Sequence, residues 1–531
     1  MAIECGPRGV VTRFSRIAAL VVTAFTIQST YNTAAVGAAA DPVPTFRSKS
    51  HVVLIDVLVT DRDGSPVRGL KRDDFTLNDD GAAQTISGFE EHQREKSGEQ
   101  SAQIVVEPNS YTNWIALPSK GAANIIVFDV LNTGASGRLY GRQQMLKFLK
   151  QIPPGERVAL FMLDTRLRMV QDFTSDPDVL VAAASKIRMG SGPQPDAVAL
   201  AGDVHVDTMS MRVAYTLDAI RDLGRVTASL PGRKNVIWLT TGFPIAVRPG
   251  ATNSPLGDIK VVNQQRDFTG DVRKVATTLA AMQIAIYPVD LNGLEAKTLG
   301  SDQHKSFNGR DERDTMLALA QETGGRAYLN KNDLNTGIAR VLTTDSNYYT
   351  LAYTPRNIKW NGSYHTVSVK LRRKNVQLTY RRGYHATGDS PITQQQASRI
   401  LGEVLDNGAL DSRMIVIAAK VSQPEAPGQP LRMTVNIDPS TLVFDDMADG
   451  RNSAALAIAA AAWDAENHKV SDIARKMEPL FEPQQLASAR MTGIPWTLEM
   501  KLKPGAYTLK LAVVDLKSGK AGSLTVPLKV R

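Results

Sequence analysis

The chain has 531 residues, of which 43% are hydrophobic and 22% are charged. Such a length favours three or four domains, and the hydrophobic content is enough for ordinary cores, which excludes a mainly disordered protein. The formal net charge of +9 is a mild excess over so long a chain. The single cysteine, Cys5, excludes an internal disulfide framework and a metal site built from several thiolates.

Residues 1–40 have the features of a signal peptide. Three arginines precede the apolar run 17–27, and three alanines at 38–40 offer a cleavage site of small residues. The apolar run is shorter than the roughly 20 residues that span a bilayer, so cleavage is favoured over an uncleaved anchor. We therefore expect export to the periplasm, the cell surface or the medium, without a stable membrane span. Cleavage removes Cys5, three arginines and one glutamate, which lowers the net charge from +9 to +7.

Two separate segments have strand character. Within residues 41–95, short β-rich runs alternate with turn formers such as Asp79, Asp80 and Gly81. Residues 345–385 contain further strands, one of which alternates polar and apolar side chains. A small sheet alone buries too little apolar surface. We therefore expect the two segments to form one β-sandwich around an inserted domain, the alternative being a separate β appendage on each side.

Within residues 120–344, expected β-strands alternate with expected α-helices, as a doubly wound α/β domain requires. The expected strands are 124–130, 156–163, 168–173, 235–240, 283–289 and 326–329. The expected helices are 137–151, 176–187, 210–229, 271–281, 312–323 and 333–342. The long polar segments 189–209, 249–268 and 295–311 are expected to be loops, which at this length are functional or disordered.

Three stretches of this region carry a family resemblance. Residues 124–133 form a buried strand that ends in Asp129 and leads into a polar loop, and residues 146–161 and 236–242 follow at domain-scale spacing. These motifs are similar to the von Willebrand factor A (VWA) domain, and the chain resembles VWA-related proteins of acidobacterial type over about residues 48–385. The resemblance implies a Rossmann-like fold, whose ligand crevice lies at the carboxyl ends of the strands, near Asp129.

The family's metal site needs an Asp-x-Ser-x-Ser loop, a threonine from a second loop and an aspartate just before a glycine. Here Leu131 replaces one hydroxyl, and Thr241 precedes Gly242 where the family has aspartate. Asp129 and Thr133 match the pattern, and Thr208 is the candidate for the second-loop threonine. A divalent cation such as Mg²⁺ needs nearly complete oxygen coordination. The resemblance thus implies a degenerate site without a cofactor, a weakly bound Mg²⁺ or Ca²⁺ being the alternative.

Two expected loops carry further candidates. Asp203, His205 and Asp207 alternate in a segment that the fold would place near Asp129, where they could complete a metal site; the alternative is a solvated loop in which Asp207 caps the next helix. Asp290 follows a strand at the same edge and either binds a ligand or caps a turn. The candidate binding residues are Asp129, Asn132, Thr133, Thr241 and Asp290, and the candidate metal ligands are Asp129, Thr133, Thr208 and Asp203.

A polar linker is expected at 386–398, because it is rich in turn formers, and a further domain at 400–531. Repeated short strands there favour a β-sandwich of immunoglobulin-like type. The alanine-rich run 454–463 fits either a strand or a helix.

No motif for nucleophilic, metallohydrolase or phosphate-binding chemistry is present. Basic runs such as 370–374 fit a solvated strand face, and no module for reading nucleic acid is found. We therefore expect an exported, non-catalytic interaction or adhesion module that binds a protein or polymer partner at the envelope through the crevice and long loops. A metal-dependent adhesion module is the second hypothesis, and an unrecognised hydrolase is the third.

Overall fold

The computed structural model describes the chain from residue 52 to residue 530 with several gaps. The described ranges are 52–93, 109–114, 122–153, 156–187, 202–243, 246–247, 266–291, 303–329, 334–356, 358–388, 390–424, 426 and 428–530. The expected signal peptide lies outside these ranges, as do residues 189–201, 249–265 and 295–302 of the expected loops. None of the helices within the described ranges is long and apolar enough to cross a membrane.

A five-stranded sheet forms the centre of the α/β region. Its strands are β6 (Ala123–Asp129), β7 (Val158–Leu163), β8 (Leu167–Thr174), β9 (Lys234–Thr240) and β12 (Ile284–Asp290). Their order is β12-β9-β6-β7-β8, and only the edge strand β8 runs antiparallel to its neighbour. All residues of β9 are buried, as expected for a parallel strand with both faces covered. Of the expected strand 326–329, only a bridge between Tyr328 and Val289 forms.

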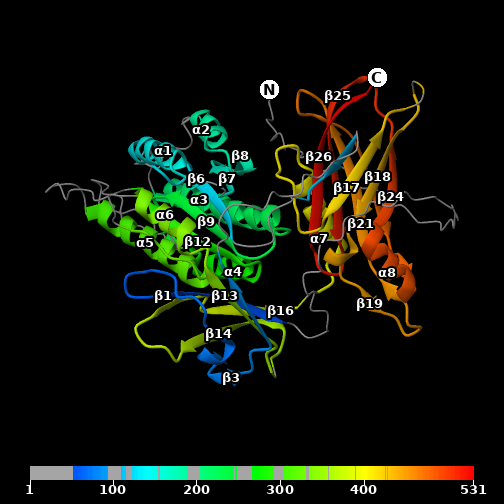
Figure 1. Cartoon of the computed structure of the whole chain (residues 1–531). Helices are drawn as coiled ribbons and strands as arrows, with labels where there is room; N and C mark the ends of the chain where they lie inside the picture. The colour runs from blue at the N-terminus through cyan, green and yellow to red at the C-terminus, as the bar shows by residue number, and fades with distance from the viewer. Residues whose placement is uncertain are drawn as a thin grey trace, which may run out of the picture. The chain divides into compact units, whose positions relative to one another are not determined.

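Helices cover both faces of this sheet, as Figure 1 shows. The helices are α1 (Ala135–Leu149), α2 (Pro177–Ser185), α3 (Gly202–Thr227), α4 (Thr269–Ala281), α5 (Gln303–Thr323) and α6 (Leu334–Thr343). On one face, α1, α2 and α6 bury residues such as Phe148 against Phe128. On the other, α3, α4 and α5 bury residues such as Leu217 against Val127. The expected doubly wound arrangement of a parallel sheet between two helical layers is therefore present.

Two helices begin earlier than the sequence indicated. Helix α3 begins at Gly202, so the backbone of residues 203–207 is helical where a loop was expected. The interpretation of Asp207 as the N-cap is therefore wrong, because this residue lies inside the helix. Helix α5 begins at Gln303 instead of 312. A short ribbon of β10 (Ala246–Val247) and β11 (Arg266–Asp267) lies between β9 and α4 in the chain.

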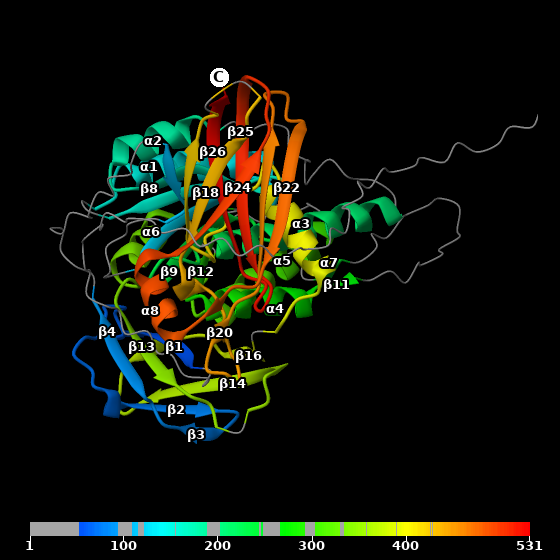
Figure 2. The ribbon, with the colours of Figure 1, turned by 90° about the vertical axis from the view of Figure 1, so that its right-hand side faces the viewer.

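Two antiparallel four-stranded sheets are built from segments far apart in sequence, and Figure 2 shows several of their strands. Their order is β15-β1-β13-β4 and β16-β14-β2-β3. The early strands are β1 (Val53–Thr60), β2 (Phe75–Asp79), β3 (Ala82–Gln84) and β4 (Gly88–His92), with a 3-10 turn at Arg72–Asp74. The late strands are β13 (Tyr348–Tyr353), β14 (Asn361–Leu371), β15 (Gln377–Thr379) and β16 (Gly383–Thr387). One hydrophobic core, which includes Ile55 and Leu351, is formed by residues of both segments.

The C-terminal region contains two further antiparallel four-stranded sheets, β24-β18-β17-β5 and β22-β21-β25-β26. Their strands are β5 (Ser110–Thr112), β17 (Ile417–Ser422), β18 (Leu431–Ile437), β21 (Leu456–Trp463), β22 (Lys469–Met477), β24 (Ile494–Met500), β25 (Gly505–Asp515) and β26 (Ala521–Val530). Smaller elements are α7 (Gln394–Leu405), a 3-10 turn at Pro439–Thr441, β19 (Asp445–Asp446), β20 (Asn452–Ser453), β23 (Leu480–Phe481) and α8 (Pro483–Thr492). Residues such as Met433 and Leu511 join both sheets in one core.

Three features of this region differ from or refine the sequence interpretation. The alanine-rich run is the strand β21, which lies between β22 and β25. Helix α7 begins at Gln394, inside the segment expected to be a linker, and its Thr393 cap accepts a hydrogen bond from the Gln396 backbone N–H. Strand β5, which precedes the α/β region in sequence, pairs with β17.

Candidate functional site

The crevice of the α/β domain is set by the order of its strands. After β6 the chain forms β7 on one side and later β9 on the other, so the order reverses at β6. In doubly wound folds, ligands bind at such a reversal, beyond the carboxyl ends of the strands. Asp129 is the last residue of β6, while Thr240 and Asp290 end β9 and β12 and are paired with each other. The three residues therefore lie at one edge of the sheet.

The carboxylate of Asp129 is fully buried and accepts four hydrogen bonds. Its Oδ1 accepts the backbone N–H of Asn132 at 2.9 Å. Its Oδ2 accepts the Asn132 amide at 2.9 Å, the Trp238 indole N–H at 3.1 Å and the Thr240 hydroxyl at 2.8 Å. Burial raises the pKa of Asp129, and the donors from Asn132, Thr240 and Trp238 oppose that rise. The network fixes the carboxylate and directs both its oxygens toward neighbouring protein donors.

Asn132 connects three elements around this carboxylate. Its side-chain amide also donates to the Thr216 hydroxyl on α3 at 2.9 Å. Its Oδ1 accepts the guanidinium of Arg212, also on α3, at 3.2 Å. The hydroxyl of Thr241 donates to the Asn132 backbone carbonyl. A buried amide with all of these partners is held in one orientation, because any rotation would leave buried polar groups unpaired.

Leu131 and Thr133, on either side of Asn132, have different environments. Leu131 belongs to the hydrophobic core, where it lies in the same cluster as Val213 and Leu217 of α3. An apolar side chain at this position contributes to packing and supplies no ligand oxygen. Thr133 is also buried, and its hydroxyl has no hydrogen-bond partner among the residues that the structure describes. Its backbone carbonyl accepts Nε of the buried Arg138 at 2.6 Å.

The turn after β9 explains why a glycine follows Thr241. Gly242 has φ of +88°, a region that is costly for residues with a Cβ atom. A Cβ atom at this position would also lie 2.7 Å from the backbone oxygen of Glu312. The backbone N–H of Gly242 donates to the Thr240 hydroxyl at 2.9 Å, which orients that hydroxyl toward Asp129.

The remaining sequence candidates lie around this centre. Asp290 is buried, its backbone N–H donates to the Tyr328 carbonyl at 3.0 Å, and its Oδ2 lies 3.9 Å from Nε of Arg313. Thr208 is half-buried on α3. Asp203 is on the same helix, but its side chain lies outside the described part of the chain.

Sequence reasoning missed the residues that complete the network: Arg138, Arg212, Thr216, Trp238 and Thr240. Trp238 and Thr240 alternate along β9, so both face the same side of the sheet, and this period was a usable signal. Arg212 and Thr216 are four residues apart on α3 and so share one helix face. Their reach to Asn132 depends on how α3 packs, which the sequence alone did not indicate.

Two apolar side chains are exposed beside the buried arginines of the site. Leu139 follows Arg138 near the beginning of α1 and is 59% exposed, and Met211 precedes Arg212 on α3 and is 54% exposed. Both arginines hydrogen-bond the loop that follows β6, at Thr133 and Asn132. The two side chains, which we call the apolar rim, lie on α1 and α3, the helices whose arginines hydrogen-bond the loop after β6.

No protein-family model and no curated protein matches this chain. Several solved structures match part of it. An aerotolerance-related membrane protein from Bacteroides fragilis is 13% identical, with 41% of this chain and 96% of that chain covered and a TM-score of 0.25. The vWF domain of the type V pili tip protein Mfa5 from Porphyromonas gingivalis is 11% identical, with 41% and 93% covered and a TM-score of 0.25. Proximal thread matrix protein 1 from the mussel byssus, with a zinc-occupied MIDAS motif, is 14% identical, with 44% and 48% covered and a TM-score of 0.24.

The assignment of fold class rests on the strand order and the helical layers described above, since these likenesses are weak. The chain is a mixed α/β protein in which a mainly parallel sheet with helices on both faces forms a doubly wound, Rossmann-like domain. Several antiparallel sheets accompany that domain.

Proposed function

We propose that this chain is an exported, non-catalytic binding module that holds a partner at the crevice beyond β6. The observation that carries the proposal is that both oxygens of the buried Asp129 carboxylate accept hydrogen bonds from the protein itself. A general base, a nucleophile or a metal ligand must direct a lone pair toward the reacting group or ion. In Asp129 these lone pairs accept protein donors instead. The carboxylate then acts as a structural anchor for the loop that shapes the crevice.

The apolar rim favours a protein partner over a sugar polymer. Interfaces between proteins gain most from a few apolar or aromatic side chains that become buried at the centre. Leu139 and Met211 are large and exposed. They lie on α1 and α3, whose arginines hydrogen-bond the loop that follows β6. The long segments around 189–201 and 295–302 would add further contacts.

The second candidate is a metal-dependent adhesion module with a weakly bound Mg²⁺ or Ca²⁺. It is favoured by one observation, the buried hydroxyl of Thr133 without a hydrogen-bond partner. In that case Asp129, Thr133, Thr208 and Asp203 would supply oxygen ligands, after release of some donors from Asp129. The guanidinium of Arg212 at Asn132 opposes this candidate, because it already brings a positive charge into the loop.

The proposal includes a domain organisation. Residues 1–40 are a cleaved signal peptide, residues 41–95 and 345–385 share one sandwich, and residues 120–344 are the inserted VWA-like domain of acidobacterial type with a degenerate metal site. The C-terminal region, proposed as residues 400–531, is an immunoglobulin-like sandwich. The linker proposed at 386–398 includes the beginning of α7 at Gln394. Support for the shared sandwich comes from the pairing of β1 with β13 and β15.

The test is capture of envelope proteins by the immobilised mature chain. Proteins solubilised from the cell envelope of the source organism are applied in buffer with Mg²⁺ and, separately, with a chelator. We expect the same captured protein in both buffers. A double change, Leu139→Ser with Met211→Ser, should reduce its capture by roughly tenfold or more, because apolar anchors dominate such interfaces.

Met491→Ser is the matched control, since Met491 on α8 is 89% exposed and distant in sequence from the crevice. It should leave capture unchanged. Equal capture by the wild type and the double variant would overturn the proposed crevice. Capture that requires Mg²⁺ and is lost in Thr133→Val would establish the metal-dependent alternative instead.

A further inference from the structure

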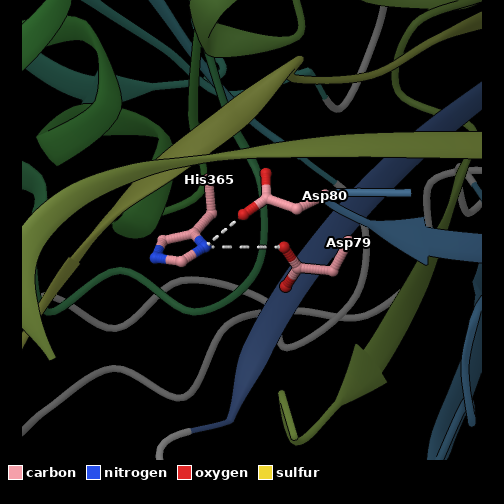
Figure 3. A group of neighbouring side chains, drawn as sticks. All are labelled: Asp79, Asp80 and His365. Carbon is pink, nitrogen blue, oxygen red and sulfur yellow. Dashed lines mark hydrogen bonds and ion pairs between the residues drawn. The ribbon is translucent and has the colours of Figure 1, made fainter. Parts of the chain in front are cut away.

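The sandwich built from the early and late segments contains a group of three ligand-type side chains. Asp79 is the last residue of β2, Asp80 follows it in the turn to β3, and His365 lies on β14. One carboxylate oxygen of each aspartate and Nδ1 of the histidine all lie within 4.8 Å of one another. In Figure 3 both carboxylates face the same ring nitrogen. Nδ1 is 2.8 Å from Asp80 Oδ2 and 3.9 Å from Asp79 Oδ1.

Asp79 supplies the independent observation that points to a ligand. Its side chain is only 1% exposed, and its Oδ1 accepts no hydrogen bond within the described part of the chain. Its other oxygen, Oδ2, accepts the hydroxyls of Tyr353 at 2.8 Å and Tyr384 at 2.7 Å. Leaving a buried carboxylate oxygen without a donor costs free energy. The two tyrosines hold the carboxylate so that the unsatisfied oxygen faces His365 and Asp80.

The other two side chains are also held by neighbouring groups. Asp80 Oδ1 accepts the backbone N–H of Thr366 at 2.7 Å, which leaves Oδ2 directed at the imidazole. Nε2 of His365 lies 3.0 Å from the Ser363 hydroxyl, and the ring stacks on Tyr384 with centroids 5.5 Å apart. Metal-binding residues are typically oriented in this way, through the atoms that do not bind the metal.

We propose that Asp79 Oδ1, Asp80 Oδ2 and His365 Nδ1 form a binding site for a divalent transition metal of the zinc class. One imidazole and two carboxylates are ordinary ligands for such an ion, which binds them at roughly 2.0–2.2 Å. In a tetrahedron of that size the ligand atoms are about 3.3 Å apart. The separations of 2.8 and 3.9 Å lie on either side of this value, so small side-chain movements form the site. Asp80 is 52% exposed, so the fourth position opens to water or to a carboxylate of a partner.

The ion would connect segments that are 285 residues apart in sequence, because His365 and Asp80 lie on either side of the α/β insertion. A metal that binds only the folded chain stabilises it by mass action. The bound ion would therefore cross-link the β2–β3 turn to β14. It is independent of the crevice at Asp129.

The test is uptake of Zn²⁺ by the mature full-length protein after treatment with a chelator. Equilibrium dialysis followed by elemental analysis should give one tightly held Zn²⁺ per chain, and Zn²⁺ should raise Tm by several degrees. Co²⁺ in place of Zn²⁺ should give a visible d–d absorption band of a four-coordinate site with nitrogen and oxygen ligands. The variants Asp80→Asn and His365→Gln should lose metal uptake, the Co²⁺ band and the Tm shift.

Asp80→Asn is a conservative change, because asparagine tolerates the φ of +47° at this position and keeps an oxygen for the Thr366 N–H. His468→Gln is the matched control, since His468 also lies near an aspartate, with Nδ1 3.5 Å from Asp464 Oδ2, but is exposed. That control and Asp129→Asn should both retain Zn²⁺. Failure of the wild type to take up Zn²⁺ or Co²⁺, or equal uptake by His365→Gln, would overturn the proposal. The group would then be explained by the hydrogen bond between His365 and Asp80 alone.

Discussion

Two buried carboxylates, Asp129 in the α/β region and Asp345 just beyond it, have opposite surroundings. Asp129 accepts four hydrogen bonds from Asn132, Trp238 and Thr240. Within the described residues, neither oxygen of Asp345, just after α6, accepts a well-formed hydrogen bond, although its side chain interacts with that of Tyr287. Burial raises the pKa of Asp345 to about 6, although the positive charges of Arg326, Arg233 and Arg340 oppose the rise. The charged form of Asp345 therefore lowers the stability of the folded state at neutral pH.

This environment predicts a pH-dependent free energy of unfolding. Between the ordinary pKa of 3.8 and the folded-state value of about 6, the folded chain binds more protons at Asp345 than the unfolded chain does. Stability should then fall as the pH rises through this window, by about 3 kcal/mol at most. Asp345→Asn removes the titrating group, so its free energy of unfolding should lack this fall. Urea unfolding at intervals between pH 4 and pH 7 measures the difference between the two proteins.

The control is Asp178→Asn, at an exposed carboxylate in the first turn of α2. It should keep the pH profile of the wild type. Parallel profiles for the wild type and Asp345→Asn would contradict the assignment of the pH dependence to Asp345.

At the scale of elements, long segments with a clear hydrophobic period were predictable from the sequence, whereas short segments and those with a misleading composition were not. The central strands and the helices of the α/β region were found within a few residues, except for the beginnings of α3 and α5. Polar side chains in residues 203–207 suggested a loop, but the segment continues the helix. The alanines of β21 have high helix propensity, and their pairing with β22 and β25 overrides it. Strand β5 has only three residues, too few for any period to appear.

The candidate site was predictable only in part. Asp129 could be placed from the sequence. In this fold class, a carboxylate that follows a buried strand lies at the carboxyl end of the sheet, where ligands bind. The partner Arg212 could not be placed in this way, because the packing of α3 brings it to Asn132 from a distant position in the sequence. The group at Asp79 and His365 could not be predicted either, because its residues are 286 positions apart in sequence and only the tertiary structure brings them together. Sequence patterns indicate faces of elements, whereas contacts between faces depend on the tertiary structure.

Strand β5 illustrates how a short element is held by one side chain. Asn113, which follows it, is buried and donates to the carbonyls of Ser412 and Ile415, both at 2.9 Å. Its Oδ1 accepts the backbone N–H of Ile417 at 2.8 Å. Asn113→Ala would leave three buried backbone groups without this partner. We expect a loss of about 2 to 4 kcal/mol of stability and faster hydrogen exchange at β5 and β17.

Hydrogen–deuterium exchange with mass spectrometry checks this prediction. Asn407→Ala is the control, because the side chain of Asn407 donates to that of the exposed Asn467 at the surface and bonds no strand backbone among the described residues. It should leave exchange at β5 unchanged. If Asn113→Ala exchanges like the wild type at β5, backbone pairing with β17 alone is enough to hold the strand.

At the scale of the whole molecule, the chain leaves the first sandwich and later returns to it. Strand β1 pairs with β13 and β15, and β2 pairs with β14, so strands from before and after the α/β region lie side by side in both sheets. The residue just before β9 also contacts this sandwich, since the Arg233 N–H donates to the Tyr348 hydroxyl at 3.0 Å. Folding of the early segment therefore depends on residues that are synthesised about 300 positions later.

This topology makes the early segment aggregation-prone on its own. A fragment of residues 41–344 keeps β1, β2 and β4 but loses all their partners from β13 to β16. Unpaired strand edges and an uncovered apolar face promote aggregation. A fragment of residues 120–344 lacks these strands and should stay soluble, because both faces of its own sheet are covered by helices. The measurement is the soluble fraction after expression, followed by size-exclusion chromatography.

Complementation makes the prediction specific to strand pairing. Co-expression of residues 345–388, which contain β13 to β16, should return the 41–344 fragment to solution as a stable complex of both polypeptides. The same residues with Thr350→Pro should fail to do so, because proline removes a backbone donor from the middle of β13, which has strands on both sides. Equal solubility of the 41–344 and 120–344 fragments without a partner would instead favour separate β appendages. In that case the early strands would be stable without the late ones, and the pairing of β1 with β13 would not be required for folding.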